Sequence, residues 1–373
     1  MKFLIITHVE HKLKGENISA YAPYVREMNL WLKYVDEVFI VAPKTQEEKT
    51  AIDLDYRHSN IQFSEIPAIQ FTDFKNAIRS FCKLPIILMA IYRASKNADH
   101  IHLRCPGNIG LLGGLVQIFF PKKVKTAKYA GNWDPKAKQP FSYKLQKWLL
   151  SNTFLTKNMS VLVYGTWKNQ TKNIKQFFTA SFKKDEIEFP EVRDYSETLQ
   201  FVFIGTLVEG KRPLLTIQIV ENLQKKGKKV SLDIFGDGVL RPELESYINH
   251  NNLKDFVTFH GNQNKQVVKQ ALKNAYFLIL PSKSEGWPKA VAESMFYGTI
   301  PITTSISCVP WMLDFGKRGI LIEPNLVDAV DKIVSYLGKE EELIEMSKLA
   351  SKWSQNYTLN TFETEVSKLL KHK

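Results

Sequence analysis

The feature that most constrains the fold is an alternation, present in both halves of the 373 residues, of short Val-, Ile- and Phe-rich runs with longer segments of helical periodicity. Continuous apolar runs are typical of strands buried on both faces, and intervening helices are the connections that parallel strands need. Strands are expected at 2–7, 38–42, 100–103, 124–129, 161–164, 200–204, 230–235, 257–260, 275–280, 300–303 and 320–322. Helices are expected at 23–34, 74–97, 109–119, 142–154, 214–226, 242–251, 266–274 and 289–297, with two more after residue 326.

A polar stretch at 183–198, which contains Pro190, has the composition of a linker. The chain is also long for a single hydrophobic core. We therefore predict an α/β protein with two Rossmann-like, doubly wound domains that face a cleft. The predicted parts are residues 1–190, residues 191–354, and a C-terminal helix in 355–373 that packs back toward the first domain. Ligands on such sheets bind beyond the carboxyl ends of the strands.

The cysteine content and the length of the apolar runs indicate the cellular compartment in which the protein is expected. Cys82, Cys105 and Cys308 are scattered and form no CxxC pair, which argues against a disulfide framework and a structural zinc site. The longest nearly apolar run, 109–120, is shorter than the about 20 residues of a spanning helix. No signal-peptide pattern is visible at the start. We expect a cytoplasmic protein.

The net charge of +13 is unevenly distributed. Residues 1–195 contain 29 Lys and Arg against 18 Asp and Glu, whereas residues 196–373 contain 22 against 20. The excess is concentrated in 121–184, with fourteen Lys and one acid, Asp134. A basic face predicts an anionic partner such as membrane lipid, nucleic acid or a charged substrate. The alternative is that these lysines point in all directions and only aid solubility.

The strongest motif runs from Leu280 to Glu293 and reads LPSKSEGWPKAVAE. A buried strand ends at Leu280, a loop carries Glu285, and Pro288 is suited to the first turn of a helix. The N–H groups at the start of that helix form a cradle for a pyrophosphate. Glu285 and Glu293 are carboxylates at two depths, which suits recognition of hydroxyls on two sugars. The alternative is an ordinary strand–loop–helix with solvated acids.

Two further motifs precede it. A strand ending at Ile204 leads to Gly205 and then to adjacent cations, Lys211 and Arg212, at the start of a helix. A lysine there can neutralise the charge that develops on a departing diphosphate. The segment Gly236-Asp237-Gly238 allows a close approach of a ligand to the backbone, and the absence of a third glycine argues against a dehydrogenase.

Together these motifs are familiar. Gly205 with Lys211, Gly236-Asp237-Gly238, His260-Gly261, and Glu285 followed by Glu293 after seven residues occur in this order. The stretch 201–324 resembles the retaining glycosyltransferases of family 4, the glycogen-synthase-like group 1 type. The resemblance is looser over the first half of the chain. It implies the two-domain GT-B fold, with an acceptor-binding N-terminal domain and a nucleotide-sugar-binding C-terminal domain, and catalysis without a metal ion.

The resemblance also implies roles for individual residues. Lys211 would bind the donor diphosphate, Glu285 the transferred sugar and Glu293 the nucleotide ribose, while the 236–238 loop would line the base pocket. The full expected donor set is Gly15, Gly205, Thr206, Lys211, Arg212, Gly236, Gly238, Glu285, Gly286, Trp287, Pro288, Lys289 and Glu293. Lys211 and Glu285 are also expected to be catalytic.

The sequence departs from the family pattern at two places. Thr206 stands where members usually carry an arginine, so either Arg212 substitutes or diphosphate binding relies on Lys211 alone. No histidine follows the strand at 124–129. Asn132 or Asp134 takes that catalytic role, or His102 reaches in from the neighbouring strand. Acceptor recognition is expected in the loop 8–21, where Gly15 and Glu16 follow the first strand.

Two further segments resemble functional motifs but also have ordinary structural interpretations. Asp53-Leu54-Asp55 resembles a metal-binding DxD, but no strand is expected to lead into it, and we interpret it as surface. The segment 71–93 mixes apolar and basic residues. It is either an interfacial membrane helix or, more commonly, a core helix with one wet face.

The sequence thus predicts a metal-independent retaining glycosyltransferase that moves a hexose from a nucleotide-diphosphate sugar, of UDP or GDP type, to a glycan or lipid-linked acceptor. Such a reaction belongs to surface polysaccharide or glycoconjugate synthesis, with no cofactor besides the donor. The location is expected to be cytoplasmic and peripheral on the inner face of the plasma membrane. One alternative is a nucleotide-sugar epimerase, which needs acid–base pairs that are not evident. Others are an inactive transferase and a nucleic-acid-binding protein, although the basic segment lacks arginine and recognisable RNA- or DNA-binding motifs.

Overall fold

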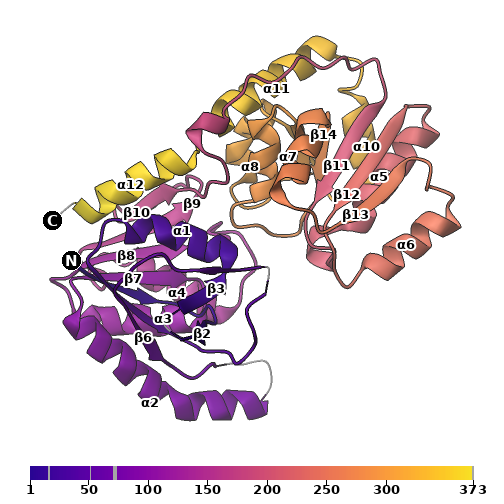
Figure 1. Ribbon diagram of the computed structural model, residues 1–373. Helices are drawn as coiled ribbons and strands as arrows, with labels where there is room; N and C mark the ends of the chain where they lie inside the picture. The colour runs from indigo at the N-terminus through magenta and orange to yellow at the C-terminus, as the bar shows by residue number, and fades with distance from the viewer. Residues whose placement is uncertain (16, 51, 70–73, 372–373) are drawn as a thin grey trace. The chain divides into compact units, whose positions relative to one another are not determined.

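The computed structural model describes residues 1–371 except 16, 51 and 70–73, and it contains two compact units (Figure 1). Unit 1 comprises Met1–Phe178 and Phe362–Lys373, and unit 2 comprises Thr179–Thr361. The division falls before residue 190 because the segment after Phe178 packs on unit 2. The Phe182 ring lies 4.8 Å from the Phe296 ring, centroid to centroid. In the part of the chain that the structure describes, no helix has the length and apolarity needed to cross a bilayer.

Unit 1 is built on a parallel sheet with the strand order β10-β9-β8-β7-β1-β4-β6. Its strands are β1 (Lys2–Ile6), β4 (Glu37–Ala42), β6 (Ile61–Glu65), β7 (His100–Cys105), β8 (Val124–Tyr129), β9 (Met159–Tyr164) and β10 (Ile174–Phe177). The five strands expected here are confirmed, whereas β6 and β10 were not expected. Both are edge strands with exposed side chains, so they lack the continuous apolar run of a central strand.

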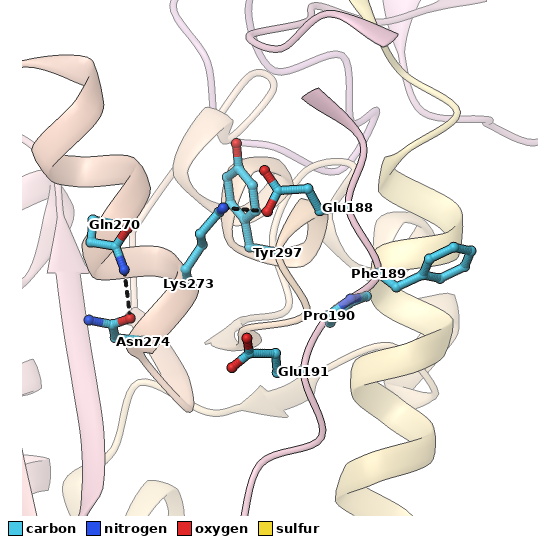
Figure 2. Close-up of a pocket in the computed structure, with 8 residues that line it drawn as sticks. All are labelled: Glu188, Phe189, Pro190, Glu191, Gln270, Lys273, Asn274 and Tyr297. Carbon is cyan, nitrogen blue, oxygen red and sulfur yellow. Dashed lines mark hydrogen bonds and ion pairs between the residues drawn. The ribbon is translucent and has the colours of Figure 1, made fainter. Parts of the chain in front are cut away.

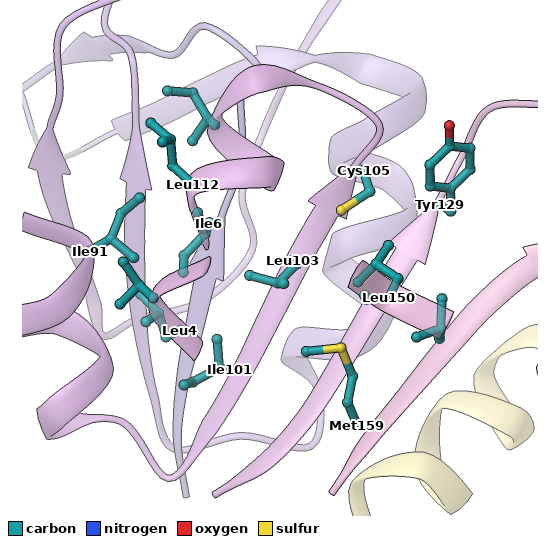
Figure 3. Packing of buried hydrophobic residues seen from close by; sticks show 14 of the residues in the cluster. Leu4, Ile6, Ile91, Ile101, Leu103, Cys105, Leu112, Tyr129, Leu150 and Met159 are labelled. Carbon is teal, nitrogen blue, oxygen red and sulfur yellow. The ribbon is translucent and has the colours of Figure 1, made fainter. Parts of the chain in front are cut away.

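Helices cover both faces of this sheet. They are α1 (Ala22–Leu32), α2 (Phe74–Asn97), α3 (Asn108–Val116) continued by the 3-10 turn η1 (Gln117–Phe119), α4 (Phe141–Ser151) and α12 (Leu359–Lys371). Side chains from β1, β7 and α2 to α4, including Ile6, Ile91, Leu103 and Leu150, form one buried apolar cluster (Figure 3). On the other face, Trp31 of α1 stacks on Phe3 with ring centroids 5.9 Å apart.

A small antiparallel sheet follows β1 and was not expected. It consists of β2 (Lys12–Lys14), β3 (Asn17–Tyr21) and β5 (Asp53–Asp55), in the order β2-β3-β5. The interpretation of 53–55 as strandless surface is therefore wrong for Asp53. Its carboxylate is nearly buried and lies 2.8 Å from the Lys12 ammonium, while Asp55 pairs with Lys49 at 2.7 Å.

Unit 2 has a second parallel sheet, of order β13-β12-β11-β14-β15-β16. Its strands are β11 (Leu199–Ile204), β12 (Val230–Phe235), β13 (Val257–Gly261), β14 (Phe277–Leu280), β15 (Ile300–Thr304) and β16 (Ile320–Ile322). Its helices are α5 (Pro213–Lys225), α6 (Arg241–His250), α7 (Lys265–Asn274), α8 (Lys289–Phe296), α9 (Val309–Met312), α10 (Leu326–Val334) and α11 (Glu340–Ser354), with 3-10 turns η2 (Lys184–Glu186), η3 (Glu209–Lys211) and η4 (Asp314–Gly316). All strands and helices expected for this half are present, and three helices follow residue 325 instead of two.

Two of the lysines in the basic segment do not contribute to its surface. Lys128 is fully buried in unit 1, where its ammonium lies 3.0 Å from the Glu27 carboxylate and donates to the Phe178 carbonyl oxygen at 3.0 Å. Arg104 binds the other oxygen of Glu27 at 2.7 Å, and these cations hold the pKa of Glu27 at about 2 despite its burial. Lys125 is also buried and donates to the Phe120 carbonyl oxygen at 2.9 Å. A charge count along the sequence does not detect this.

Candidate active site

The strand order of unit 2 defines one topological switch point. The chain runs outward from β11 to β12 and β13, then returns to the other side of β11 and continues from β14 to β16. The loops after β11 and β14 therefore leave the sheet in opposite directions. Ligands of doubly wound sheets bind at this switch point, beyond the carboxyl ends of the strands. The switch point lies at Gly205 and Pro281, the residues that follow β11 and β14.

Lys211 and Glu285 meet at this switch point. Lys211 ends η3 in the loop after β11, and Glu285 lies in the loop between β14 and α8. Their ammonium and carboxylate groups form an ion pair whose Glu285 side chain is only 10% exposed. The two residues are 74 positions apart, and the sheet brings together the cation and the carboxylate that the sequence assigned to one donor.

Further contacts join the same two loops. The Lys283 amide donates to the Gly210 carbonyl oxygen at 2.8 Å, and the Lys283 ammonium pairs with Glu209. Arg212 has a left-handed backbone, with φ of 51°, and its guanidinium donates to the Pro281 carbonyl oxygen at 3.0 Å. Thr206 is exposed at the start of the loop. Arg212 thus holds the two loops together through a backbone carbonyl.

The glycines of the Gly236-Asp237-Gly238 segment are required by the loop after β11. A Cβ atom at Gly236 would lie 1.9 Å from the Gly205 carbonyl oxygen, and one at Gly238 would lie 2.5 Å from the Leu207 carbonyl oxygen. The Leu207 amide donates to the Asp237 carbonyl oxygen at 3.0 Å. The backbone that approaches these glycines most closely is therefore that of the neighbouring loop.

Helix α8 begins directly after the Glu285 loop, with Pro288 as its N-cap. The first N–H groups of an α-helix lack partners within the helix, and the positive end of its dipole lies there. Glu293 is the fifth residue of α8, and its carboxylate accepts a hydrogen bond from the Ser181 hydroxyl. Ser181, Lys289 and Glu293 line one small pocket of unit 2. No sequence motif pointed to Ser181, because it lies 112 positions from Glu293, just before the predicted linker.

Hydrogen bonds and aromatic packing hold the loop before α8 in place. The Gly286 carbonyl oxygen accepts hydrogen bonds from the Ser307 hydroxyl at 3.3 Å and the Cys308 thiol at 3.1 Å. Burial raises the pKa of Cys308 to about 12, so it is a neutral donor at physiological pH. Trp287 is nearly buried and packs against Trp353 and Tyr357, with ring centroids 6.1 and 5.5 Å away. Trp287 therefore supports the loop through an aromatic cluster.

His260 has a well-defined environment at the end of β13. Its ring stacks on Phe235 with centroids 4.5 Å apart and planes inclined by 8°. Its Nε2 atom lies 2.6 Å from Asp233 Oδ1, and Gln200 donates to the other oxygen of Asp233 at 2.7 Å. This rigid aromatic pair occupies the carboxyl ends of β12 and β13.

Unit 1 has a switch point of its own, between β1 and β7, because the chain continues from β1 to β4 and β6 on one side and from β7 to β10 on the other. A pocket of about 260 Å³ lies there, lined by residues that include His8, Glu10, Gly107, Asn108 and Tyr143. Burial, and then Arg104, lowers the pKa of His8, which favours the neutral ring.

The predicted residues of unit 1 have separate environments. Asn132 accepts from the Asp134 amide at 2.9 Å, and Asp134 accepts from the Lys136 amide at 2.8 Å, so both carboxamide and carboxylate shape the loop after β8. Gly15 turns the β2–β3 hairpin with φ of 60°. Glu16 lies outside the described residues. The suggestion that His102 reaches a ligand is wrong. It is fully buried, bonded to Thr126 at 2.8 Å, and burial keeps its pKa well below the usual value.

A separate pocket of unit 2 contains none of the predicted donor residues. It lies between the segment Glu188–Glu191 and α7, and it includes the ion pair of Lys273 with Glu188 (Figure 2). Among the described residues, no group of three or more His, Cys, Asp and Glu side chains is arranged to hold a metal ion.

Comparison with known proteins identifies the family of unit 2. Residues 184–357 match the family model described as "Glycosyl transferases group 1". Unit 2 belongs to the group 1 glycosyl transferases. The glycosyl transferase match covers nearly all of unit 2 and includes Lys211, Glu285 and Glu293.

Two curated relatives match part of the chain. Alpha-D-kanosaminyltransferase of Streptomyces kanamyceticus is 23% identical over 46% of this chain and 45% of its own length. Lipopolysaccharide 1,6-galactosyltransferase of Salmonella typhimurium is 30% identical over 37% of this chain and 38% of its own. The chain thus matches less than half the length of these two glycosyltransferases.

Solved structures match over the whole chain. Sucrose-phosphate synthase from Thermosynechococcus elongatus aligns with a TM-score of 0.67 and 16% identity over 99% of this chain and 98% of that one. HepE of Anabaena, in complex with UDP and glucose, aligns with a TM-score of 0.66 and 13% identity over all of both chains. These likenesses confirm the GT-B fold class with its two Rossmann-like domains.

Proposed function

We propose that this group 1 glycosyltransferase moves a hexose, with retention, from a nucleotide-diphosphate sugar to a glycan or lipid-linked acceptor. The observation that carries the proposal is the meeting of Lys211 and Glu285 at the switch point of unit 2, next to the start of α8. This arrangement combines a cation, a carboxylate and a helix N-terminus. A sugar diphosphate needs these groups: positive charge for its phosphates and acceptors for its hydroxyls.

The donor is proposed to be of UDP or GDP type. Lys211 and the first N–H groups of α8 would bind the diphosphate, and Lys211 would stabilise charge on the departing nucleotide. Glu285 would accept hydrogen bonds from the transferred sugar. Glu293 would accept from the ribose, in the way that it now accepts from the Ser181 hydroxyl. We propose that no metal ion takes part, because Lys211 and α8 supply the positive charge that the diphosphate needs.

Acceptor binding is proposed for the pocket of unit 1 at the β1–β7 switch point. Its ring, amide and carboxylate side chains suit a polyhydroxylated ligand, and Glu10 and Asn108 would bind hydroxyls. Asn132 and Asp134 remain proposed contacts to the transferred sugar. The reaction would serve surface polysaccharide or glycoconjugate synthesis, in line with the galactosyltransferase relative that acts on lipopolysaccharide. The expected location, cytoplasmic and peripheral on the inner face of the plasma membrane, stays a prediction.

The experiment that tests the function is a donor screen on the whole protein. UDP and GDP are compared by thermal shift, and UDP- and GDP-hexoses are then incubated with the enzyme while nucleotide release is measured. Release from one donor, lost in the Glu285→Gln variant and retained in Glu209→Gln, supports the proposal. Interconversion of the sugar without nucleotide release would support an epimerase, and a salt-sensitive DNA shift without nucleotide binding would favour the nucleic-acid alternative.

A further inference from the structure

Helix α2 carries large apolar side chains on the face that points away from the core. Ile87 and Ile91 are fully buried on its inner face. On the outer face, Ile78, Phe81 and Met89 are 51%, 62% and 51% exposed, and Ile86 and Tyr92 are also exposed. A surface helix normally presents polar residues to solvent, so the apolar outer face requires a separate explanation.

The exposed apolar side chains continue beyond α2. The Tyr92 ring lies 6.4 Å from the ring of Phe119, which is 72% exposed at the end of η1. Leu115 is exposed on α3, and α3 packs beside α2. We define the α2–Phe119 surface by these residues: Ile78, Phe81, Ile86, Met89, Tyr92, Leu115 and Phe119. A connected apolar surface of this kind, unlike single exposed side chains, marks an interaction site.

The charges around this surface are predominantly positive. Residues 74–159 contain fifteen Lys and Arg against two acids, Asp99 and Asp134. Every charged residue of α2 is basic, and Arg79, Arg93 and Lys96 are exposed. Asp99 lies between the end of α2 and the start of β7, and its carboxylate accepts from the Lys2 amide at 2.7 Å. The surface therefore combines apolar side chains with positive charge.

We propose that the α2–Phe119 surface docks on an anionic lipid bilayer, with α2 lying in the plane of the membrane interface. Figure 1 shows α2 on the outside of unit 1, along one side of its sheet. Apolar side chains enter the acyl boundary while basic side chains contact anionic headgroups, which is the pattern of interfacial helices. A second copy of the chain fits less well, because a symmetric contact would place these cations against one another.

This proposal goes beyond glycosyl transfer and does not rest on the donor site. The positive charge of this surface also differs from that of the lysine-rich segment 121–184 taken as a whole. Lys125 and Lys128 are buried and take no part, whereas Arg79 and Arg93 of α2 lie outside that segment.

The test is co-sedimentation of the whole protein with phosphatidylcholine vesicles that either contain or lack phosphatidylglycerol. The protein should bind only the vesicles with phosphatidylglycerol, and less as salt increases. Two double variants separate the contributions: Phe81→Ser with Phe119→Ser, and Arg79→Gln with Arg93→Gln. Each should lower vesicle affinity about tenfold or more. All four side chains are exposed in unit 1, so both variants should keep the wild-type thermal midpoint.

The matched control is Lys229→Gln with Lys254→Gln, which removes the same charge from exposed positions of unit 2. It should bind vesicles like the wild type. Equal losses in control and α2 variants, or no binding at low salt, would overturn the proposal. The proposal would also be overturned if the wild-type protein were a dimer and the Phe81→Ser and Phe119→Ser changes dissociated it without altering vesicle binding. Nucleotide release from a soluble donor should be unchanged in all variants. If the wild-type protein itself releases no nucleotide, that result counts against the proposed function and not against membrane docking.

Discussion

At the scale of single residues, the site is defined by two ion pairs that join the same two loops in opposite senses. Lys211 of the loop after β11 pairs with Glu285, and Lys283 of the loop after β14 pairs with Glu209. The Glu285 side chain is 10% exposed, whereas that of Glu209 is 82% exposed. Exposed ion pairs contribute little to stability. Variants of the two pairs can therefore distinguish a role of Glu285 in donor binding from a role in holding the two loops together.

Glu285→Gln should abolish or nearly abolish transfer while the protein stays folded. A charge-assisted hydrogen bond is worth about 1.5–3 kcal/mol, and more where it strengthens in the transition state. A loss of kcat/KM of about tenfold or more is therefore expected. Glu209→Gln changes the same group in the paired loop and should leave kcat/KM within about twofold. Similar activity in both variants would remove Glu285 from the reaction.

Glu293→Ala should raise the donor KM and change kcat little. A ribose contact is made in the ground state and in the transition state alike, so it acts as uniform binding. Ser181→Ala is the companion variant, because the Ser181 hydroxyl donates to the Glu293 carboxylate. It should leave the donor KM unchanged or lower it. A kcat defect with an unchanged donor KM in Glu293→Ala would exchange the roles proposed for the two glutamates.

Lys125 gives a pH-dependent prediction for stability. Burial lowers its pKa from 10.5 to about 8 in the folded protein. Between these values the unfolded chain binds more protons than the folded one, so stability rises with pH across this interval by at most about 1.4 kcal/mol per pH unit from this residue. The gain in free energy of unfolding from Lys125→Met should therefore shrink between pH 8 and pH 10. Denaturant unfolding of variant and wild type checks this, and a constant difference would contradict it.

At the scale of helices and strands, central strands were predictable and edge strands were not. β1, β11 and β14 are largely buried and appear in the sequence as apolar runs. In contrast, β6 has only exposed and half-buried side chains, and β10 mixes exposed and buried ones. β2 and β3 form a short polar hairpin, and β5 joins it through a distant pairing, with Ser19 opposite Asp55. Pairing partners distant in sequence leave no periodic signal.

The same reasoning explains what could be foreseen of the site. Lys211, Glu285 and Glu293 follow strands or begin helices, so topology alone brings their loops to one edge of the sheet. Ser181 and the aromatic support of Trp287 by Trp353 and Tyr357 depend on packing between distant segments. Burial of Lys125 and Lys128 likewise depends on helices that cover the sheet, so a count of charges overestimated the basic surface.

Helix α8 leads to a prediction about metal ions. Its N-terminus and Lys211 would together balance the diphosphate charge. Activity should therefore be retained in EDTA, with a change in rate of less than about twofold. The measurement is nucleotide release with and without chelator. Loss of activity that Mg²⁺ or Mn²⁺ restores would contradict it.

At the scale of the whole molecule, unit 1 is discontinuous along the chain. Phe362, at the start of the returning segment, is 1% exposed, and its ring lies 5.3 and 5.7 Å from the rings of Phe177 and Phe178. The buried ammonium of Lys128 lies 4.8 Å from the Phe362 ring centre and also bonds the Phe178 carbonyl oxygen. One buried cation thus contacts the last residue before unit 2 and the first residue after it.

Phe362→Ala should destabilise unit 1 selectively. Replacing a buried phenylalanine by alanine costs about 3–5 kcal/mol, and here it also removes an aromatic face from Lys128. Calorimetry with limited proteolysis should show earlier unfolding of unit 1 and an unchanged unit 2. Phe189→Ala, at a side chain that is 98% exposed, is the control and should leave both units as they are. Equal destabilisation of both units by Phe362→Ala would argue against the assignment of this segment to unit 1.

The discontinuity also sets an order for biosynthesis. The ribosome makes the seven strands of the first sheet early, but the helical segment that covers Phe177 and Phe178 follows all of unit 2 in the chain. Domains generally fold as units during synthesis. Unit 2 can therefore complete its fold while the first unit still has apolar rings and the buried lysine uncovered. The part of the protein that is begun first is finished last, and the nascent chain is most exposed to aggregation in that interval.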